Sequence, residues 1–510
     1  NNITVDGSYF NNSFGLSGQP GERSGVSPIA LDSIEEFQIN VAPYDVRQGN
    51  FTGAGINTVT KSGTNAYHGS GYYNWNNQNF IGKRTGNLPF NPGRSQYKLW
   101  GLTVGGPLPF FNFGENNGPA FISGRDKLFF FLSYEQEETS SPAHNFTACP
   151  GPTNSPGCGV GNVSRVSGAD LDALSAFLST RFGYETGPYQ GYNFTTPAKK
   201  FLFRSDYNID PKNRLTLRYL SLDSSTDRPV SGSNSGNTAG FGRGGQGVRY
   251  LSFANSNYKI LENIRSFVGE WTTVPSAGMA NSLIVGYTVQ DESRPQLTKL
   301  FPLVDIHDGT AATTTSPNLS TNTALTSFGF EPFTPLNTLK YNSLQIQDNL
   351  SFYRGAHTIQ AGVSFEKYHS MNIFFPSSQS IYSYRSLSDF YADANAYLNG
   401  VPSIVSPVRF NVRYSNQPGL TEPVQPLDVK YVGLYGQDQW RVSDDFTVTY
   451  GLRIEVPFFG QTGFKNSLVD TLTFRGGEKL STEKLPGANI VWSPRVGFNW
   501  NPLKSDKLQI

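Results

Sequence analysis

The feature that most constrains the fold is a period of two in hydrophobicity, which recurs along most of the chain. From Phe446 to Ile454 every even position is apolar, and the odd positions are Thr, Thr, Gly and Arg. Successive side chains of a strand point to opposite faces of a sheet, so this alternation predicts a strand with one apolar and one polar face. The same alternation occurs in 357–366, 214–219 and 495–500. We therefore expect an extended sheet built of such strands.

The candidate strands are unusually long. Most span ten residues or more, whereas strands of soluble sheets usually have about five or six. A tilted strand needs about 9–11 residues to cross a bilayer, so these lengths predict membrane-spanning strands. The candidates lie near 66–75, 95–106, 126–137, 199–209, 214–222, 264–274, 279–291, 342–352, 357–370, 430–442, 446–457, 490–501 and from 507 onward.

The connections alternate between tight turns and long loops, as in bacterial outer-membrane barrels with short periplasmic turns and long extracellular loops. The tight turns are at 210–213, 275–278, 353–356, 443–445 and 502–506. The long connections are at 138–198, 223–262, 292–341, 371–429 and 458–489. The connection at 107–125 departs from this rule, because it is long on the side where we expect tight turns.

Composition agrees with a barrel whose lumen is polar. Aromatic residues make up 14% of the chain and charged residues 15%, against roughly 25% charged residues in a typical soluble domain. The sequence has no run of about 18 apolar residues that would predict a transmembrane helix. Its 40 Lys+Arg and 39 Asp+Glu nearly cancel, which argues against a nucleic-acid partner, since such proteins carry a basic face.

Two soluble architectures also contain alternating strands. A two-sheet sandwich has mostly short loops, and several connections of about thirty residues or more argue against it. Stacked repeats need a fixed period, which the strand pairs do not share. The predicted fold class is therefore all-β, a transmembrane antiparallel β-barrel.

Residues 1–63 differ, because brief β segments there lie among many Gly, Asn and Ser residues. The segments Asn2–Gly7, Ile34–Ile39 and Gly53–Lys61 resemble strands of the plug domain of TonB-dependent outer-membrane receptors. The second segment departs from the family pattern, since Phe37 and Gln38 replace two usual residues. The resemblance predicts the C-terminal part of a plug domain at 1–63 and a β-barrel with long extracellular loops at 64–510.

The residues of five segments are similar to those of the Oar-like branch of these receptors, whose large members carry an N-terminal carboxypeptidase-regulatory-like domain. Two of the segments, Pro43–Gly49 and Thr60–Asn65, lie in or beside the plug region. The other three lie in the barrel region: Asp126–Phe131, Tyr435–Val442 and Phe446–Arg453. The chain starts at Asn1 and stops within a candidate strand. We therefore expect an incomplete barrel with about thirteen of a probable 22 strands, without the TonB-contacting segment, and we expect that such a fragment would not function alone.

The resemblance implies a receptor in the outer membrane of a Gram-negative bacterium. It would bind an extracellular nutrient and pass it to the periplasm when the plug moves, driven by a TonB-type complex that contacts a segment N-terminal to this chain. An outer-membrane adhesion or signalling barrel without transport is the alternative, and a soluble carbohydrate-processing enzyme is a third class. Aromatic and amide residues in the long loops, such as Tyr189–Phe194 and Tyr382–Tyr384, favour a carbohydrate or peptide ligand.

No catalytic, cofactor or metal site is expected. The segments Gly53–Gly55 and Gly240–Gly247 lack the Lys and Ser/Thr of a phosphate loop. Glu135, Glu137 and Glu138 are explained by a solvated strand end. No Gly-x-Ser-x-Gly and no His-Glu-x-x-His occurs, and the histidines are scattered. The histidines are His68, His144, His307, His357 and His369.

Cys149 and Cys158 are the two cysteines of the chain, nine positions apart in a stretch rich in Pro, Gly and Asn. In an oxidising compartment they would form a loop-closing disulfide. A metal site is the weaker alternative, since His144 is the only further ligand nearby. The disulfide predicts that this loop is exported.

Eight charged residues lie on the polar side of their candidate strands. A basic side chain on the lipid face costs about 2–4 kcal/mol near the bilayer midplane, so we expect these residues to face the lumen. There they would anchor the plug or be solvated, with direct ligand contact as the alternative. The residues are Arg204, Asp206, Arg214, Arg218, Glu366, Arg453, Glu455 and Arg495.

Overall fold

The computed structural model describes residues 2–12, 20–41, 44–49, 53–89, 92–114, 118–232, 245–295, 299–310, 323–415, 422–460 and 462–502. The candidate strand from 507 onward and the glycine-rich positions 240–244 lie outside these ranges. Among the described helices, none has both the length and the apolar character needed to cross a membrane.

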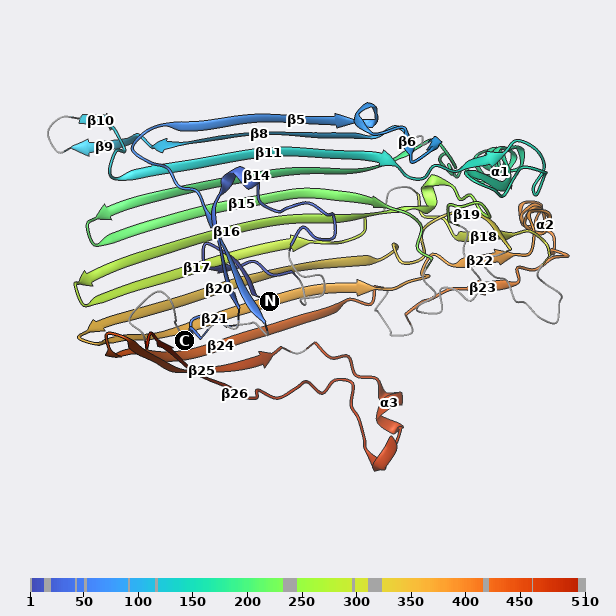
Figure 1. Cartoon of the computed structure of the whole chain (residues 1–510). Helices are drawn as coiled ribbons and strands as arrows, with labels where there is room; N and C mark the ends of the chain where they lie inside the picture. The colour runs from blue at the N-terminus through green and yellow to red at the C-terminus, as the bar shows by residue number, and fades with distance from the viewer. Residues whose placement is uncertain are drawn as a thin grey trace.

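Twelve long strands form one sheet in which each strand pairs antiparallel with the next long strand along the chain (Figure 1). They correspond to the first twelve candidate strands, and the predicted all-β, barrel-type fold is confirmed. In sheet order they are β5 (His68–Asn77), β8 (Gln96–Pro107), β11 (Leu128–Pro142), β14 (Asn193–Asp210), β15 (Asn213–Arg228), β16 (Tyr258–Ser276), β17 (Met279–Asp291), β20 (Asn337–Arg354), β21 (His357–Phe374), β24 (Gln425–Ser443), β25 (Phe446–Phe459) and β26 (Val491–Trp500).

The two faces of this sheet differ in the way that a period of two requires. Along β17, Val285 and Tyr287 are exposed, whereas Ile284, Thr288 and Gln290 are buried. We call the face with exposed apolar side chains the outer face and the opposite one the inner face. An outer-membrane barrel presents its apolar face to lipid and its polar face to the lumen.

A second sheet of four strands, the N-terminal sheet, lies across the inner face (Figure 1). Its order is β2-β1-β4-β3, and β1 runs parallel to β4 although some fifty residues separate them. Val5 and Phe10 pack with Leu220 and Ile264 of the inner face in one hydrophobic cluster. The strands are β1 (Asn2–Val5), β2 (Ser8–Tyr9), β3 (Ile34–Val41) and β4 (Ala54–Thr60), and the 3-10 helix η2 (Leu31–Ser33) precedes β3.

Four long connections fold together beyond one end of the long strands (Figure 1). Strands β18 and β22, from different connections, pair in parallel, and residues from all four connections share one hydrophobic core. We call this unit the loop cap. It consists of β12 (Thr147–Cys149), β13 (Val163–Ser167), α1 (Gly168–Phe182), η5 (Ala254–Ser256), β18 (Leu303–His307), β19 (Ala324–Phe328), β22 (Ile381–Tyr384), α2 (Leu387–Leu398) and β23 (Arg409–Asn411).

The remaining elements are short. The long connection at 107–125 contains the hairpin of β9 (Phe110–Gly114) and β10 (Gly118–Ile122), which accounts for its length at the end of the sheet that has the tight turns. The others are η3 (Gln78–Phe80), β6 (Arg84–Thr85), β7 (Leu88–Pro89), α3 (Ser467–Thr471) and η6 (Arg475–Gly477).

Candidate functional site

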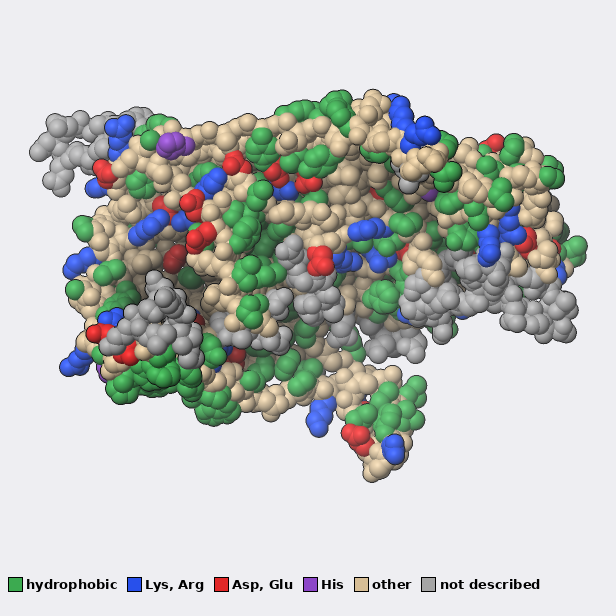
Figure 2. All heavy atoms as spheres, in the orientation of Figure 1, with side chains coloured by type: hydrophobic (Ala, Val, Ile, Leu, Met, Phe, Trp, Pro, Cys, Tyr) green, Lys and Arg blue, Asp and Glu red, His purple; other side chains and the backbone are tan. Residues whose placement is uncertain are grey.

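Charged and amide side chains of the inner face hold the N-terminal sheet. Figure 2 shows positive and negative side chains gathered on the face against which this sheet lies. All eight charged residues expected in the lumen have the parity of the inner face. Four of them contact the N-terminal region in two separate groups, one at the N-terminal sheet and one at the segment 44–49 between β3 and β4.

The first group surrounds Asp6, in the tight turn between β1 and β2. Asp6 and Gly7 both have positive φ, at 48° and 78°, which an Asp-Gly pair adopts readily in a two-residue hairpin. Arg218 Nη1 lies 3.0 Å from Asp6 Oδ2, and Arg204 Nη1 lies 3.5 Å from Asp6 Oδ1. Thr60 of β4 donates to the same carboxylate through its amide and its hydroxyl, both at 2.8 Å. One carboxylate therefore links two strands of the N-terminal sheet to two strands of the inner face.

Arg204 is held in place from both sides. It donates to the Thr60 carbonyl at 2.8 Å, and its Nε lies 3.0 Å from Asp206 Oδ2. Arg214 reaches the same Asp206 at 2.7 Å, although about half of the Arg214 side chain is exposed. Asp206 thus positions Arg204, whereas Arg214 lies at the margin and pairs with Asp206.

The second group holds the segment 44–49. Arg453 Nη1 donates to the Val46 carbonyl at 3.2 Å, and Arg495 donates to the carbonyls of Asp45 and, at 2.8 Å, Gln48. Val46 is fully buried. Because guanidinium groups carry several donors in a fixed plane, two arginines can fix a short segment that has no regular secondary structure.

Glu455 and Glu366 lie on the inner face of the twelve-stranded sheet, which we also call the wall. Glu455 Oε1 lies 2.9 Å from Arg453 Nη2, which also donates to Ser364 at 2.9 Å. Glu366 accepts from the Ser343 hydroxyl at 2.7 Å. Glu455 therefore compensates the charge of Arg453, whereas Glu366 bonds to the neighbouring strand β20.

A third group was missed by the sequence analysis. Glu262 accepts hydrogen bonds from the backbone amides of Gly21 and Ser24 and from the Ser24 hydroxyl, and Arg23 pairs with Glu292 at 2.9 Å. Glu262 has the parity of the inner face, but the candidate strand began at residue 264, so its side chain was assigned to a loop. Extending the alternation by two residues would have found it.

Amide side chains were also missed. Gln345 accepts from the Tyr9 amide at 2.7 Å and from the Ser8 hydroxyl at 3.1 Å, while Gln290 donates to the Asn11 carbonyl at 2.9 Å. A Cβ at Gly286 would collide with Ser8, so this glycine permits the close approach of β2 to the wall. The signal available in the sequence was an amide side chain at an inward-facing position of a candidate strand.

A cavity of about 310 Å³ lies between the N-terminal sheet and the inner face. Its charged members have partners close by, because Asp45 and Arg47 form an ion pair at 2.6 Å and the Glu270 carboxylate accepts a hydrogen bond from Ser282 at 2.8 Å. Most of the other lining side chains are uncharged and polar: Asn2, Thr4, Tyr9, Gln38, Asn40, Gln48, Asn57, Gln347 and Asn349. Such a surface can form hydrogen bonds with hydroxyl or amide groups.

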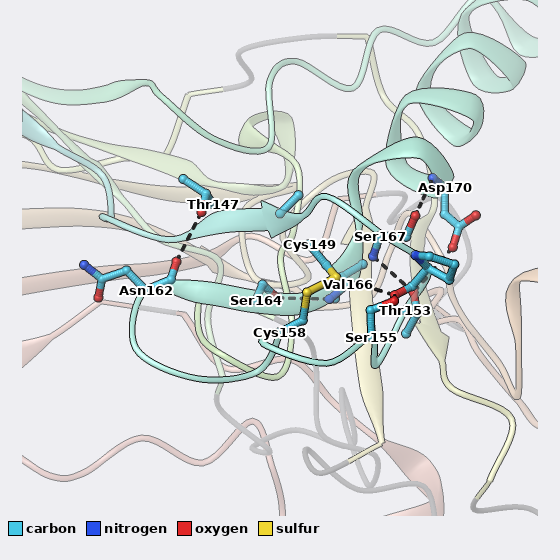
Figure 3. Close-up of a disulfide and its surroundings, with 12 residues drawn as sticks. Thr147, Cys149, Thr153, Ser155, Cys158, Asn162, Ser164, Val166, Ser167 and Asp170 are labelled. Atoms are coloured by element: carbon cyan, nitrogen blue, oxygen red, sulfur yellow. Dashed lines mark hydrogen bonds between the residues drawn. A yellow bond between two sulfur atoms is a disulfide. The ribbon is translucent and has the colours of Figure 1, made fainter.

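The loop cap contains the two cysteines. Cys149 and Cys158 are joined in a disulfide next to β13 and the start of α1 (Figure 3). Ser167 caps α1 by accepting from the Asp170 amide at 3.2 Å, and its own amide donates to Thr153 within the disulfide-closed loop. The His144 ring stacks on Phe146 and meets Tyr192 edge to face. The described residues contain no cluster of His, Cys, Asp and Glu that could hold a metal ion.

Burial perturbs one histidine of the loop cap. His307, at the end of β18, is fully buried, and burial lowers its pKa to about 4. The negative charge of Asp308 opposes this shift and the positive charge of Arg165 adds to it. The imidazole is therefore neutral at physiological pH.

Comparison with known proteins agrees with this architecture. A family model described as "Outer membrane beta barrel domain" matches residues 59–510. The TonB-dependent transporter Oar of Myxococcus xanthus is 29% identical over 138 residues, which are 26% of this chain and 11% of that protein.

Among solved structures, the outer membrane transporter YddB from Escherichia coli aligns over 98% of this chain and 50% of its own, with 11% identity and a TM-score of 0.52. The siderophore receptor PirA from Pseudomonas aeruginosa aligns over 99% and 51%, with 10% identity and a TM-score of 0.47. The chain spans about half the length of each of these two proteins. The YddB match shows a shared fold.

Proposed function

This chain belongs to the outer membrane beta barrel domain family, and we propose that it works as a TonB-dependent receptor that binds an extracellular nutrient and passes it to the periplasm. The predicted resemblance to TonB-dependent outer-membrane receptors is confirmed, as is the location in the outer membrane of a Gram-negative bacterium. The family and the fold are those of transporters and receptors.

The observation that carries the proposal is the polar attachment of the N-terminal sheet to the inner face. Asp6 reaches Arg204 and Arg218, and the segment 44–49 reaches Arg453 and Arg495. Hydrogen bonds and ion pairs can be exchanged for bonds to water at modest net cost, so such a sheet can move without unfolding the wall. We propose residues 1–63 as the C-terminal part of a plug and 64–510 as its barrel.

The energy for that movement would come from a partner in the periplasm. We propose a TonB-type complex that acts through a segment N-terminal to this chain. The name of the Myxococcus xanthus relative, a TonB-dependent transporter, supports this partner. Tension from that segment would reach β1 at Asn2, whose side chain donates to the Gly49 carbonyl at 2.9 Å, and then pass along the strand to Asp6.

The lining of the cavity supports a ligand rich in hydroxyl or amide groups, that is, a carbohydrate or a peptide. Uncharged amide and hydroxyl side chains predominate there, Asp45 and Arg47 neutralise each other, and Glu270 accepts a hydrogen bond from Ser282. A highly charged ligand would be poorly compensated by such a lining.

A reversible lock tests transport. An ideal Cβ at Gly286 lies 3.4 Å from Ser8 Cβ, close to the separation that a disulfide needs, so the double variant Ser8→Cys/Gly286→Cys can join the N-terminal sheet to the wall. The full-length protein in cells would be given fluorescent oligosaccharide and oligopeptide mixtures. We expect uptake of one mixture that needs an active TonB complex, stops in the oxidised double variant and returns on mild reduction. Ser8→Ala/Gly286→Ala is the matched control, and reductant on the native protein controls for Cys149–Cys158.

A second candidate function is adhesion or signalling without transport. The loop cap favours it, because its loops share a hydrophobic core and form a preformed surface. The same experiment separates the two functions. Surface binding of a probe that is indifferent to the lock and never reaches the periplasm would reject transport and support the second function.

A further inference from the structure

A carboxylate lies in the middle of the apolar band of the outer face. The even positions of β20 face outward. They begin with the polar Lys340 and Asn342 and end with Arg354, and Asp348 lies in the middle of the apolar stretch between them. Its outward neighbours along the strand are Leu344, Ile346, Leu350 and Phe352. An ionisable residue at such a depth is a candidate functional position, because hydrocarbon offers it no hydrogen bonds.

Asp348 has little compensation within this chain. In the part of the chain that the structure describes, its hydrogen-bond partner is Asn281 of β17, at 2.8 Å, which also faces outward. Asp438, another outward carboxylate, lies closer to the tight turns and has both His357 at 2.7 Å and Tyr450 at 2.9 Å. A carboxylate has about four acceptor positions, so Asp348 and Asn281 still offer acceptor and donor capacity to a neighbour.

A depression lies directly beside Asp348. Ala361 of β21 and Gly436 of β24 are paired in register, and the larger Leu350 and Leu452 flank them on the same row of the sheet. The small side chains leave an open notch of about 520 Å³, which is lined mostly by apolar groups and bordered by Asp348. On the opposite side of Asp348, Trp271 of β16 is about half exposed and pairs in register with Leu283.

We propose that this part of the outer face, from β16 to β24, is an interface with a second copy of the chain within the membrane. In a two-fold dimer one patch contacts itself, so it must contain both halves of every interaction. This patch has an acceptor, Asp348, beside a donor, Asn281. The notch lies on one side of this pair, and the projecting ring of Trp271 lies on the other side. Lipid tails would offer no hydrogen-bond partner to the remaining donors and acceptors of Asp348 and Asn281. A different protein would need only one half of each feature.

Cysteine cross-linking in native outer membranes tests the interface. The two native cysteines are bonded to each other, so one introduced cysteine is the only free thiol of each chain. Ile346→Cys lies next to Asp348 on β20, and Val104→Cys lies on the distant strand β8 as a control. Both native side chains are 36% exposed on the outer face. With a short bis-maleimide, we expect a covalent dimer from Ile346→Cys and little from Val104→Cys.

Two further substitutions tie the dimer to the polar pair. Asp348→Ala or Asn281→Ala, each combined with Ile346→Cys, should lower the yield of dimer about fivefold, which corresponds to about 1 kcal/mol. Should Asp348→Ala not reach the membrane, Asn281→Ala alone decides. Monomer in all variants, equal yields at Ile346→Cys and Val104→Cys, or an adduct with the mass of another protein would each overturn the proposal.

Discussion

Arg218 of the wall and Asp6 of the N-terminal sheet form a buried ion pair, with Arg218 Nη1 3.0 Å from Asp6 Oδ2 and the Arg218 side chain 1% exposed. A buried pair contributes little beyond the cost of removing its charges from water, but loss of one partner leaves the other charge unpaired. The attachment of the N-terminal sheet should therefore be sensitive to changes on either side of this pair.

Asp6→Asn should detach the N-terminal sheet while leaving the long strands folded. Asparagine tolerates the positive φ of this turn and keeps an acceptor for Thr60, but it leaves Arg218 without a charged partner, at a cost of about 3 kcal/mol. Hydrogen-exchange protection of the amides in β1 and β4 should fall accordingly.

Two comparisons interpret that result. Asp223→Asn removes the charge from an exposed pair with Arg265 and should cost less than about 1 kcal/mol. Arg218→Met added to Asp6→Asn should recover part of the loss, because it removes the unpaired charge. Unchanged protection in Asp6→Asn would mean that the ion pair does not hold the sheet.

Glu262→Gln should loosen the segment 20–25 selectively. The carboxylate accepts from the Gly21 and Ser24 amides and from the Ser24 hydroxyl, and hydrogen bonds to a charged group contribute about 1.5–3 kcal/mol. Exchange of the Gly21 and Ser24 amides should speed up, whereas exchange in β4 should not. Glu138→Gln, at an exposed position of β11, is the matched control, and equal effects of the two variants would contradict the proposed role of Glu262.

The long strands were predictable because each one encodes its own two faces. In β25 the alternation from Phe446 to Ile454 is complete without reference to any partner strand. The loop cap was not predictable in this way. Strand β18 (Leu303–His307) is buried on both sides and does not alternate, and its parallel partner β22 lies more than seventy residues away. Local signals for α1 were present, since Ser167, Asp170 and Gly183 mark its two ends.

The candidate site divides along similar lines. The alternation predicted that Arg204, Arg218 and Arg453 lie on the inner face, because the sequence of one strand is enough to show which of its residues share a face. Their partners could not be predicted, since Asp6 and Val46 lie some 200 to 400 residues away in sequence. Gln345 was overlooked because an inward amide has the same appearance in sequence whether it meets water or a plug.

Loss of the disulfide should loosen one part of the loop cap. Cys149 and Cys158 close a short loop that packs against β13 and the start of α1. Because a cross-link restricts the unfolded chain, Cys149→Ser/Cys158→Ser should lower the local stability by about 2–4 kcal/mol. Proteolysis should then cleave between residues 143 and 167 in the variant, and the long strands should remain protected. Equal protease resistance of the two forms would show that the loop is held by its hydrogen bonds alone.

The stability of the loop cap should depend on pH through His307. Burial lowers the pKa of His307 to about 4 from the ordinary value of 6.5. Above pH 6.5 the imidazole is neutral in the folded and the unfolded chain, so it contributes no pH dependence. Between pH 6.5 and 4 the unfolded chain binds a proton that the folded cap excludes. The free energy of unfolding should therefore fall by about 1.4 kcal/mol per pH unit over this window and level off below it.

Hydrogen-exchange protection factors of the β18 and β19 amides, measured at pH 7, 6 and 5, report this loss directly. His307→Gln supplies the control, because glutamine keeps a polar group for Thr323, which lies 3.0 Å from His307 Nδ1, but does not titrate. Its protection factors should change less between pH 7 and 5 than those of the native protein. Parallel profiles of the two proteins would mean that His307 is not the titrating group, and protection that rises as the pH falls would contradict its burial in the neutral form.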